Sequence, residues 1–259
     1  MEEFLKQLDH NVYDESWLRQ FVGDADMPAR KIGVSRFYMR GYVASRKGLP
    51  SQQAESLLEH DFLTLLEYDP RVERFVAQPF TIEWNDKNGK RRKYTPDVIV
   101  KYSCLAQFHE PWLKTTIFEV KPRNKLKEDW DELRPKFRAA IGWAKEFGCT
   151  FHLVTDQEIR TPFLKNARHL LGYGHPSQFE SNEALWPDRF FLVQNAMVYL
   201  KQSTPSELIR AITDNTDHQA ELIPYLWSCI KKGIIGANLE LPLSMNSPIW
   251  WNRNDENRQ

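Results

Sequence analysis

Residues 94–121, YTPDVIVKYSCLAQFHEPWLKTTIFEVK, decide the fold of this protein. The stretch opens and closes with short runs of β-branched and aromatic residues, which predict two strands. Each run carries polar residues where its surroundings are apolar: Asp97 at the start of the first, and Glu119 and Lys121 at the end of the second. Side chains two residues apart leave the same face of a strand. If the two strands are neighbours, Asp97 meets the face that Glu119 and Lys121 share.

Periodic patterns around this stretch predict an α/β unit. Apolar residues at helical spacing between Ser51 and Pro70 predict a helix with Ser51 as its N-cap. The sequence DKNGK at residues 86–90 predicts the turn of a hairpin. Helix, strand hairpin, strand, helix and strand in this order predict a mixed central sheet. The expected strands are residues 74–77, 80–84, 93–102, 115–120 and 150–154, and the later expected helices are residues 128–147 and 162–171.

The pattern changes in the last third of the chain. Gly, Pro and Ser gather in residues 172–177, which predicts a linker. A capping-box pattern at residues 204–207 opens a helix, and a second helix is expected at residues 220–232. Residues 234–251 then alternate around turn residues, so this part resembles a winged helix-turn-helix of the α+β class. The expected domains are residues 1–172 and residues 173–259.

Composition excludes several classes of protein. The cysteines, Cys104, Cys149 and Cys229, are odd in number and form no CxxC pattern, so we expect reduced thiols and neither disulfides nor a zinc site. No apolar run approaches the ~18 residues of a membrane helix. The acidic, polar N-terminus is unlike a secretory signal. These features predict a cytosolic protein with no membrane partner.

Basic residues concentrate in two places, although the 35 basic and 35 acidic residues balance. No acidic residue lies between Asp26 and Glu55, and aromatic residues are interleaved with the basic ones there. The basic residues of this segment are Arg30, Lys31, Arg36, Arg40, Arg46 and Lys47. A second group, Lys87, Lys90, Arg91, Arg92 and Lys93, surrounds the predicted turn. A charge run alone is typical of a solvated surface, but two patches flanking a candidate metal site favour contacts with DNA phosphates.

The polar residues of the two strands predict a metal site. Two carboxylates within several Å repel each other, and one takes a proton at neutral pH unless a cation lies between them. Hard oxygen ligands suit Mg²⁺, with Mn²⁺ as a substitute. Such ions polarise a scissile phosphate and activate a bound water, while Lys121 orients that water or neutralises developing charge. Glu59, on the predicted helix, completes the expected set with Asp97 and Glu119.

Single motifs of this kind are weak evidence. Glu-x-Lys arises on any half-exposed strand with alternating charges, and a Pro-Asp dipeptide often opens a strand. Their order carries more information: a helix with Glu, a hairpin, Pro-Asp at a strand start, then Glu-x-Lys followed by Pro on the next strand.

Several linked motifs resemble one family. RKIGVSRFYMRGYVASRK (residues 30–47), ESLLEHDFLTLLEYDPRV (55–72), AQPF (77–80), YTPDVIV (94–100) and FEVKP (118–122) follow one another as in TnsA, the endonuclease subunit of heteromeric transposases. The resemblance covers roughly residues 28–172. From Tyr173 onward the chain is similar in outline to the C-terminal winged-helix-like domain of that family.

The resemblance implies a restriction-endonuclease-like fold and a PD-(D/E)xK nuclease site. Glu59 matches the helix acid, Asp97 the acid after Pro, Glu119 the second strand acid and Lys121 the lysine. The implied metal ligands are Glu59, Asp97, Glu119 and Val120. Glu55, one helical turn before Glu59 in the predicted helix, is the rival helix ligand. Gln78 lies in a family motif, where an amide that fixes a bend is favoured over a catalytic role.

The resemblance also implies partners. TnsA proteins cut the 5′ ends of a transposon in double-stranded DNA, a TnsB-like DDE transposase cuts the 3′ ends, and a TnsC-like AAA+ ATPase binds the C-terminal domain. Two alternatives stay open from the sequence. One is a stand-alone restriction-type or junction-resolving nuclease, and the other is a catalytically idle DNA-binding adaptor that recruits an AAA+ ATPase.

Overall fold

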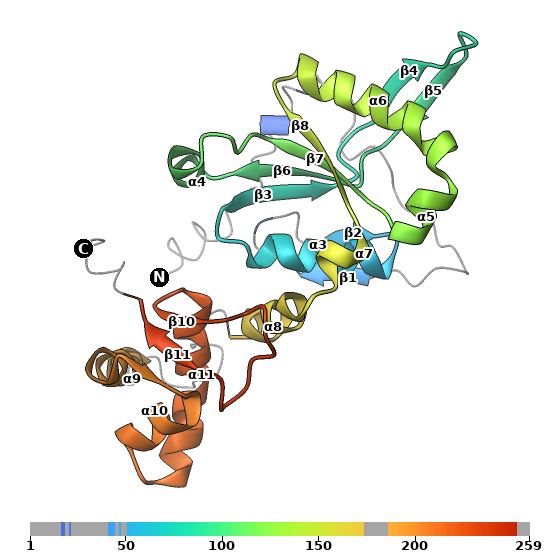
Figure 1. Ribbon diagram of the computed structural model, residues 1–259. Helices are drawn as coiled ribbons and strands as arrows, with labels where there is room; N and C mark the ends of the chain where they lie inside the picture. Colours follow the sequence, from blue (N-terminus) through green and yellow to red (C-terminus); the bar gives the residue numbers. More distant parts are fainter. Residues whose placement is uncertain are drawn as a thin grey trace. The chain divides into compact units, whose positions relative to one another are not determined.

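The chain folds into two compact units, residues 1–159 and residues 160–259, in the computed structural model (Figure 1). The structure describes residues 17–18, 21, 41–44, 47, 51–173 and 186–252. Each unit is described by itself below.

A four-stranded mixed sheet forms the centre of the first unit (Figure 1). Its strands are β3 (Val72–Ala77), β6 (Val98–Tyr102), β7 (Thr116–Val120) and β8 (Thr150–Val154), in the order β3-β6-β7-β8. β6 is antiparallel to both β3 and β7, whereas β7 and β8 are parallel. This confirms the predicted mixed α/β class and meets the condition set above, that the two strands carrying the polar residues are neighbours.

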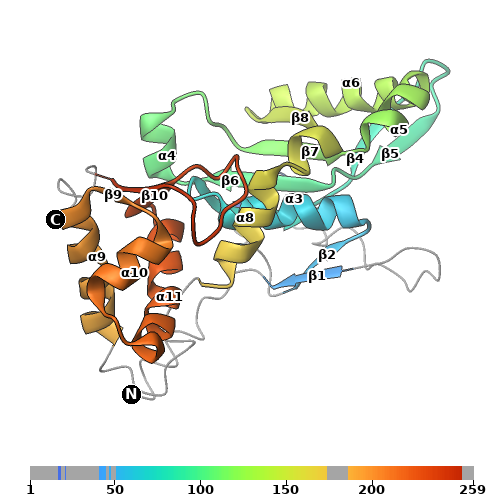
Figure 2. The ribbon, with the colours of Figure 1, turned by 60° about the horizontal axis from the view of Figure 1, so that its bottom comes forward.

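Helices cover both faces of the sheet, which explains why its central strands are apolar almost throughout. α3 (Leu57–Tyr68) lies on one face, where the Phe62 ring packs 5.1 Å from the Phe118 ring. α6 (Trp130–Glu146) lies on the other face and buries Ala140 and Ala144 in a cluster with Ile117. Figure 2 shows the two helices on opposite sides of the strands. α6 confirms the predicted helix 128–147 almost in full, and α5 (Arg123–Glu128) precedes it as a separate helix that was not expected.

The predicted hairpin is confirmed as β4 (Ile82–Asn85) paired with β5 (Arg91–Tyr94). Gly89 in its turn has φ +74°, a backbone conformation that glycine adopts without steric cost. The single strand expected at residues 93–102 is wrong, because residues 95–97 separate β5 from β6. Pro96 has no N–H to give to a strand partner, so pairing stops there.

The start of α3 also differs from the prediction. Ser51 belongs to β2 (Ser51–Ala54), which pairs with β1 (Gly41–Ala44), so Ser51 is not the N-cap. Ser56 is the N-cap instead, and its side chain accepts a hydrogen bond from the Glu59 N–H at 3.2 Å. β1, β2 and the short helices α4 (Cys104–His109) and α7 (Asp156–Ile159) were not expected from the sequence.

The second unit is helical with a small sheet. Its helices are α8 (Pro162–Leu171), α9 (Trp186–Leu200), α10 (Pro205–Ile212) and α11 (Thr216–Lys231). Its antiparallel sheet has the order β10-β11-β9, from β9 (Gln202–Ser203), β10 (Ile235–Ala237) and β11 (Ile249–Trp251). The predicted capping box is confirmed, since Thr204 and Glu207 each bond the other's backbone N–H at the start of α10. α9 was not expected.

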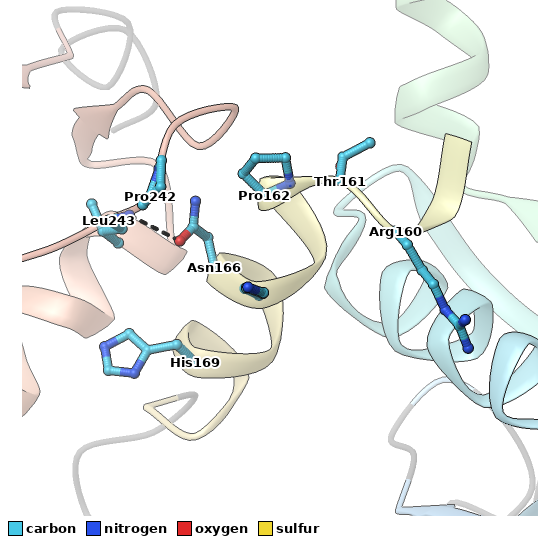
Figure 3. Close-up of a pocket in the computed structure, with 8 residues that line it drawn as sticks. Arg160, Thr161, Pro162, Asn166, His169, Pro242 and Leu243 are labelled. Carbon is cyan, nitrogen blue, oxygen red and sulfur yellow. Dashed lines mark hydrogen bonds between the residues drawn. The ribbon is translucent and has the colours of Figure 1, made fainter. Parts of the chain in front are cut away.

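Asn166 ties α8 to the loop before β11. Its amide group donates to the Leu239 and Leu241 carbonyls at 2.7 and 2.8 Å, and its oxygen accepts the Leu243 N–H at 3.0 Å. Figure 3 shows this last bond beside a pocket lined by residues of α8 and the loop. α8 thus belongs to the second unit, so the division after residue 159 lies before this helix, whereas the expected boundary at residue 172 lies after it. None of the described helices has the length and apolar character needed to cross a bilayer.

Candidate active site

Asp97 lies where β6 begins, directly opposite the end of β7. The register pairs Val98 with Phe118, and the Asp97 N–H donates to the Phe118 carbonyl at 3.1 Å. The Asp97 side chain turns along the end of β7, where its Oδ2 accepts the Val120 N–H at 2.7 Å. Backbone pairing on one side and the carboxylate bond on the other hold Asp97 against the strand that carries Glu119 and Lys121.

Glu119 is the most deeply buried charge of the site, with 1% of its surface exposed. Its Oε2 accepts the Tyr94 hydroxyl at 2.7 Å, and its Oε1 faces two ammonium groups, Lys136 at 2.8 Å and Lys121 at 3.3 Å. Burial and the Glu119 charge raise the pKa of Tyr94, so that its hydroxyl keeps the proton that it donates. A buried carboxylate needs such partners, because an unpaired charge is costly away from water.

Lys121 is surrounded by carboxylates. Its backbone N–H donates to the Val154 carbonyl at 3.0 Å, which continues the pairing of β7 with β8 by one residue. Burial alone would lower the Lys121 pKa, but the charges of Asp97, Glu119 and Glu59 outweigh it and raise the pKa. Lys121 therefore carries a positive charge at neutral pH and is unsuited to act as a general base.

Glu59 reaches the site from α3. Its Oε2 accepts the Glu55 N–H at 2.8 Å and its Oε1 accepts the Ser56 hydroxyl at 3.0 Å. A small cavity of about 10 Å³ is lined by Glu59 and Asp97 together with apolar residues of α3 and the sheet; this is close to the smallest space that holds one water molecule. Glu55 precedes the helix and does not line this cavity, which supports Glu59 as the helix acid over its rival.

The positive charge near Asp97 and Glu59 does not offset the cost of burying their carboxylates. Burial raises the pKa of Asp97 well above its usual range, the nearby Glu119 raises it further, Lys121 opposes the rise, and Glu59 adds to it. Burial likewise raises the pKa of Glu59, against the hydrogen bonds from Glu55 and Ser56 and the charge of Lys121. A cavity between two carboxylates that disfavour their own charge fits a small divalent cation held by oxygen ligands.

The ligand set is not closed around one point. Among the described residues, no three His, Cys, Asp or Glu side chains are already placed to surround one ion. Glu59 and Asp97 share the cavity, whereas both oxygens of Glu119 have hydrogen-bond partners of their own. Val120, an apolar residue, can offer an ion only its backbone carbonyl, and its N–H already holds Asp97. The residues fit a divalent cation provided that Glu119 exchanges one partner for it.

The raised pKa values predict how the stability of the metal-free protein depends on pH. A group whose pKa is higher in the folded than in the unfolded state binds more protons when folded, so stability falls as the pH rises through its folded pKa. Unfolding by urea with a chelator present should therefore require less urea as the pH rises above the ordinary carboxyl values, 3.8 for Asp97 and 4.5 for Glu59. Asp97→Asn should make this pH dependence shallower. Asp131→Asn, the same change at an exposed position of α6, is the matched control. Equal slopes for the wild type and Asp97→Asn would contradict the assignment.

Tyr94 and Lys136 belong to this cluster, although the sequence did not point to them. Tyr94 precedes the Pro-Asp motif by two residues, and Lys136 lies in the middle of α6. A signal for Lys136 was present, since it comes four residues before Ala140, which is fully buried. A lysine that close to the apolar stripe of a helix needs a buried partner, here Glu119.

Gln78 has an unusual conformation beside the site. Its φ of 48° is rare for a residue other than glycine, and such strained residues cluster at functional sites. Its N–H donates to the Asp97 carbonyl at 2.9 Å, and its side-chain oxygen is buried without a hydrogen-bond partner. The hydrogen bond to Asp97 thus comes from the backbone of Gln78, whereas the favoured interpretation expected its side-chain amide to fix the bend.

The structure describes one of the six expected DNA-binding residues, Lys47. Arg30, Lys31, Arg36, Arg40 and Arg46 lie outside the described residues. Lys47 is described, and its ammonium bonds the Leu66 and Asp69 carbonyls at the end of α3. In the second basic group, Arg92 and Lys93 pair with the hairpin's own Asp86 and Glu83.

Comparison with known proteins bears on the chemistry of this site. Residues 69–156 match the family model of the TnsA-like endonuclease N-terminal domain. This region contains Asp97, Glu119 and Lys121 with their sheet, and it begins after α3, which carries Glu59. No curated protein matches the chain. The matched region indicates a nuclease with DNA as its substrate, from a family that is typically metal-dependent.

Proposed function

We propose that this protein is a Mg²⁺-dependent DNA endonuclease of the PD-(D/E)xK type with a restriction-endonuclease-like core. The observation that carries the proposal is the convergence of Asp97, Glu119 and Lys121 on two paired strands, with Glu59 across one small cavity from Asp97. This arrangement lies largely within the region that matches TnsA-like endonucleases.

Each residue of the site has a distinct role in this proposal. Asp97, positioned by the Val120 N–H, and Glu59 would hold the cation in their cavity, with Glu119 and the Val120 carbonyl as further ligands. When bound, Mg²⁺ would polarise the scissile phosphate and acidify a bound water. Lys121 keeps its proton, so it would orient the attacking water and stabilise negative charge on the phosphate by electrostatic attraction. Tyr94 would keep Glu119 in place through its hydroxyl.

The resemblance found in the sequence supports a place in cut-and-paste transposition, with 5′-end cutting by this protein and 3′-end cutting by a DDE-type partner. The deciding experiment is a strand-resolved cleavage assay on duplex DNA that carries transposon ends. We expect cuts at the 5′ ends with Mg²⁺ only when the partner transposase is present. Efficient cleavage by this protein alone would identify a stand-alone nuclease instead.

We propose that the basic segment at residues 30–46 binds DNA phosphates. Replacing Arg30, Arg36 and Arg40 together by Gln should weaken binding, and it should lower the slope of log affinity against log salt by about 0.9 for each phosphate that the variant no longer neutralises. The matched control removes three exposed charges from α5 and α6, at Lys127, Arg138 and Lys145. Salt-dependent binding in a fluorescence anisotropy titration measures both. If the slope falls equally in both triple variants, the segment has no specific contact with DNA and is an ordinary solvated surface.

We propose that the second unit is a winged-helix-like module that contacts a protein, an AAA+ ATPase. Acidic residues Glu207, Asp214, Asp217 and Glu221 offset its basic residues, whereas readers of DNA grooves carry a clearer basic excess. Large apolar side chains of α9 are exposed, Phe191 at 63% and Tyr199 at 87%. In the full chain, Phe191→Ser with Tyr199→Ser should abolish capture of the ATPase and leave DNA affinity unchanged. Loss of DNA binding with intact capture would reverse the assignment.

A further inference from the structure

The ammonium group of Lys136 pairs with the Glu119 oxygen that a metal ion could use as a ligand. Its ammonium lies 2.8 Å from Glu119 Oε1, closer than that of Lys121 at 3.3 Å. It also lies over two aromatic rings, 5.1 Å from the centre of Tyr94 and 5.2 Å from that of Phe137. Lys136 comes from α6, whereas Asp97, Glu119 and Lys121 belong to or adjoin β6 and β7.

Both carboxylate oxygens of Glu119 have donors bound to them. Oε2 accepts the Tyr94 hydroxyl, and Oε1 takes both ammonium groups. Glu119 is almost wholly buried, so solvent does not provide a route by which an ion could approach it without disturbing these partners. A divalent cation that uses Glu119 as a ligand therefore has to displace a donor from one oxygen.

The three donors differ in how easily they move. Tyr94 is buried in the core cluster, and Lys121 pairs with Glu119 and is also attracted by the charges of Asp97 and Glu59. Lys136 and Lys121 have the same flexible four-carbon stem and similar exposure, with side chains 24% and 30% exposed, but Lys136 also lies over two aromatic rings. Its ammonium can leave Oε1 and still keep favourable contacts with the faces of Tyr94 and Phe137.

We propose that Lys136 is the resident counter-cation of Glu119, which it positions in the metal-free protein, and that a divalent cation binds by displacing Lys136 from Oε1. The inference rests on the proposed metal dependence of the site. It makes Lys136 a competitor of the metal ion, so metal affinity without DNA is kept low by a residue of the protein itself.

The test measures Mn²⁺ binding to the full chain without DNA, from the loss of the free-ion signal in electron paramagnetic resonance. Lys136→Met keeps the apolar stem and a favourable contact with the two rings but removes the charge. We expect Mn²⁺ to bind about tenfold more tightly to it, because a like charge within about 4–6 Å shifts an ionisation equilibrium by about one unit or more. Lys136→Arg should bind as the wild type does, and so should Lys145→Met, the matched change at an exposed position of α6.

A purely structural role of Lys136 predicts the opposite direction. Loss of a residue that only supports Glu119 would weaken Mn²⁺ binding or leave it unchanged, and either result in Lys136→Met overturns the inference. If that variant does not fold, Lys136→Gln gives the same comparison. Asp97→Asn separates the two proposals. If Mn²⁺ binding depends on Asp97 but is not tighter in Lys136→Met, the displacement of Lys136 is wrong and the metal site stands. Absence of any Asp97-dependent binding overturns the proposed metal site along with it.

Discussion

Asp97→Asn should lower the rate of DNA cleavage at least about a hundredfold and leave the protein folded. Losing a residue that merely orients a metal ligand costs about 10–100-fold, so losing a direct ligand should cost no less. The change keeps the shape of the side chain, and the amide oxygen can still accept the Val120 N–H. It also removes a buried charge whose pKa burial and Glu119 raise, so stability at neutral pH should not fall.

Single-turnover cleavage at saturating DNA and Mg²⁺ measures this effect, with the partner transposase present. Urea unfolding of the same preparation provides the check on folding. Asp131→Asn, on the exposed part of α6, is the matched control and should cleave as the wild type does. Undiminished 5′ cleavage by Asp97→Asn would show that Asp97 is not a metal ligand and would contradict the proposed site.

Lys121→Ala should reduce cleavage by about 10²–10³-fold, the loss seen when one preorganised electrostatic donor is removed, ~2.7–4 kcal/mol. The surrounding carboxylates raise the pKa of Lys121, so the wild-type residue acts on the phosphate as a full positive charge. Metal affinity should change little or rise, because a cation near Asp97, Glu119 and Glu59 disappears. In the metal-free form of this variant, Lys136 still pairs with Glu119, so the site should retain its shape until the ion binds.

Cleavage rates and Mn²⁺ affinities of Lys121→Ala and Lys121→Arg distinguish the possible roles of this lysine. The Arg variant keeps the charge and should retain more activity than the Ala variant. A Lys121→Ala protein that binds metal poorly but recovers its activity in excess Mn²⁺ would show that Lys121 supports the ligands and does not act on the substrate.

Local sequence patterns were sufficient where a single element decides the outcome. The apolar runs around Asp97 and Glu119 predicted β6 and β7, because strands buried on both faces are apolar almost throughout. The DKNGK turn predicted the hairpin because it contains Gly89, and glycine adopts the positive φ that this turn requires without steric cost. The capping box at Thr204 and Glu207 predicted the start of α10, since both bonds form within four residues.

Predictions failed where a distant segment competes for the same backbone. Ser51 has the chemistry of an N-cap, but β1 pairs with its strand, and the helix starts at Leu57 instead. This shift moves Glu55 out of the helix and leaves Glu59 on the cavity. Pro96 splits one expected strand into two, and the loop that results lets Asp97 reach the end of β7.

The sequence by itself predicted the main strands and helices of the first unit and pointed to the four polar residues proposed as the site, because each lies in a short motif with its own local pattern. Only the tertiary structure decided which other side chains meet them. Tyr94 and Lys136 are 42 residues apart in the chain, yet both contact Glu119, because the sheet and α6 bury that carboxylate between them. A charge removed from water must find its partners nearby in space, and the packing of helix on sheet selects them.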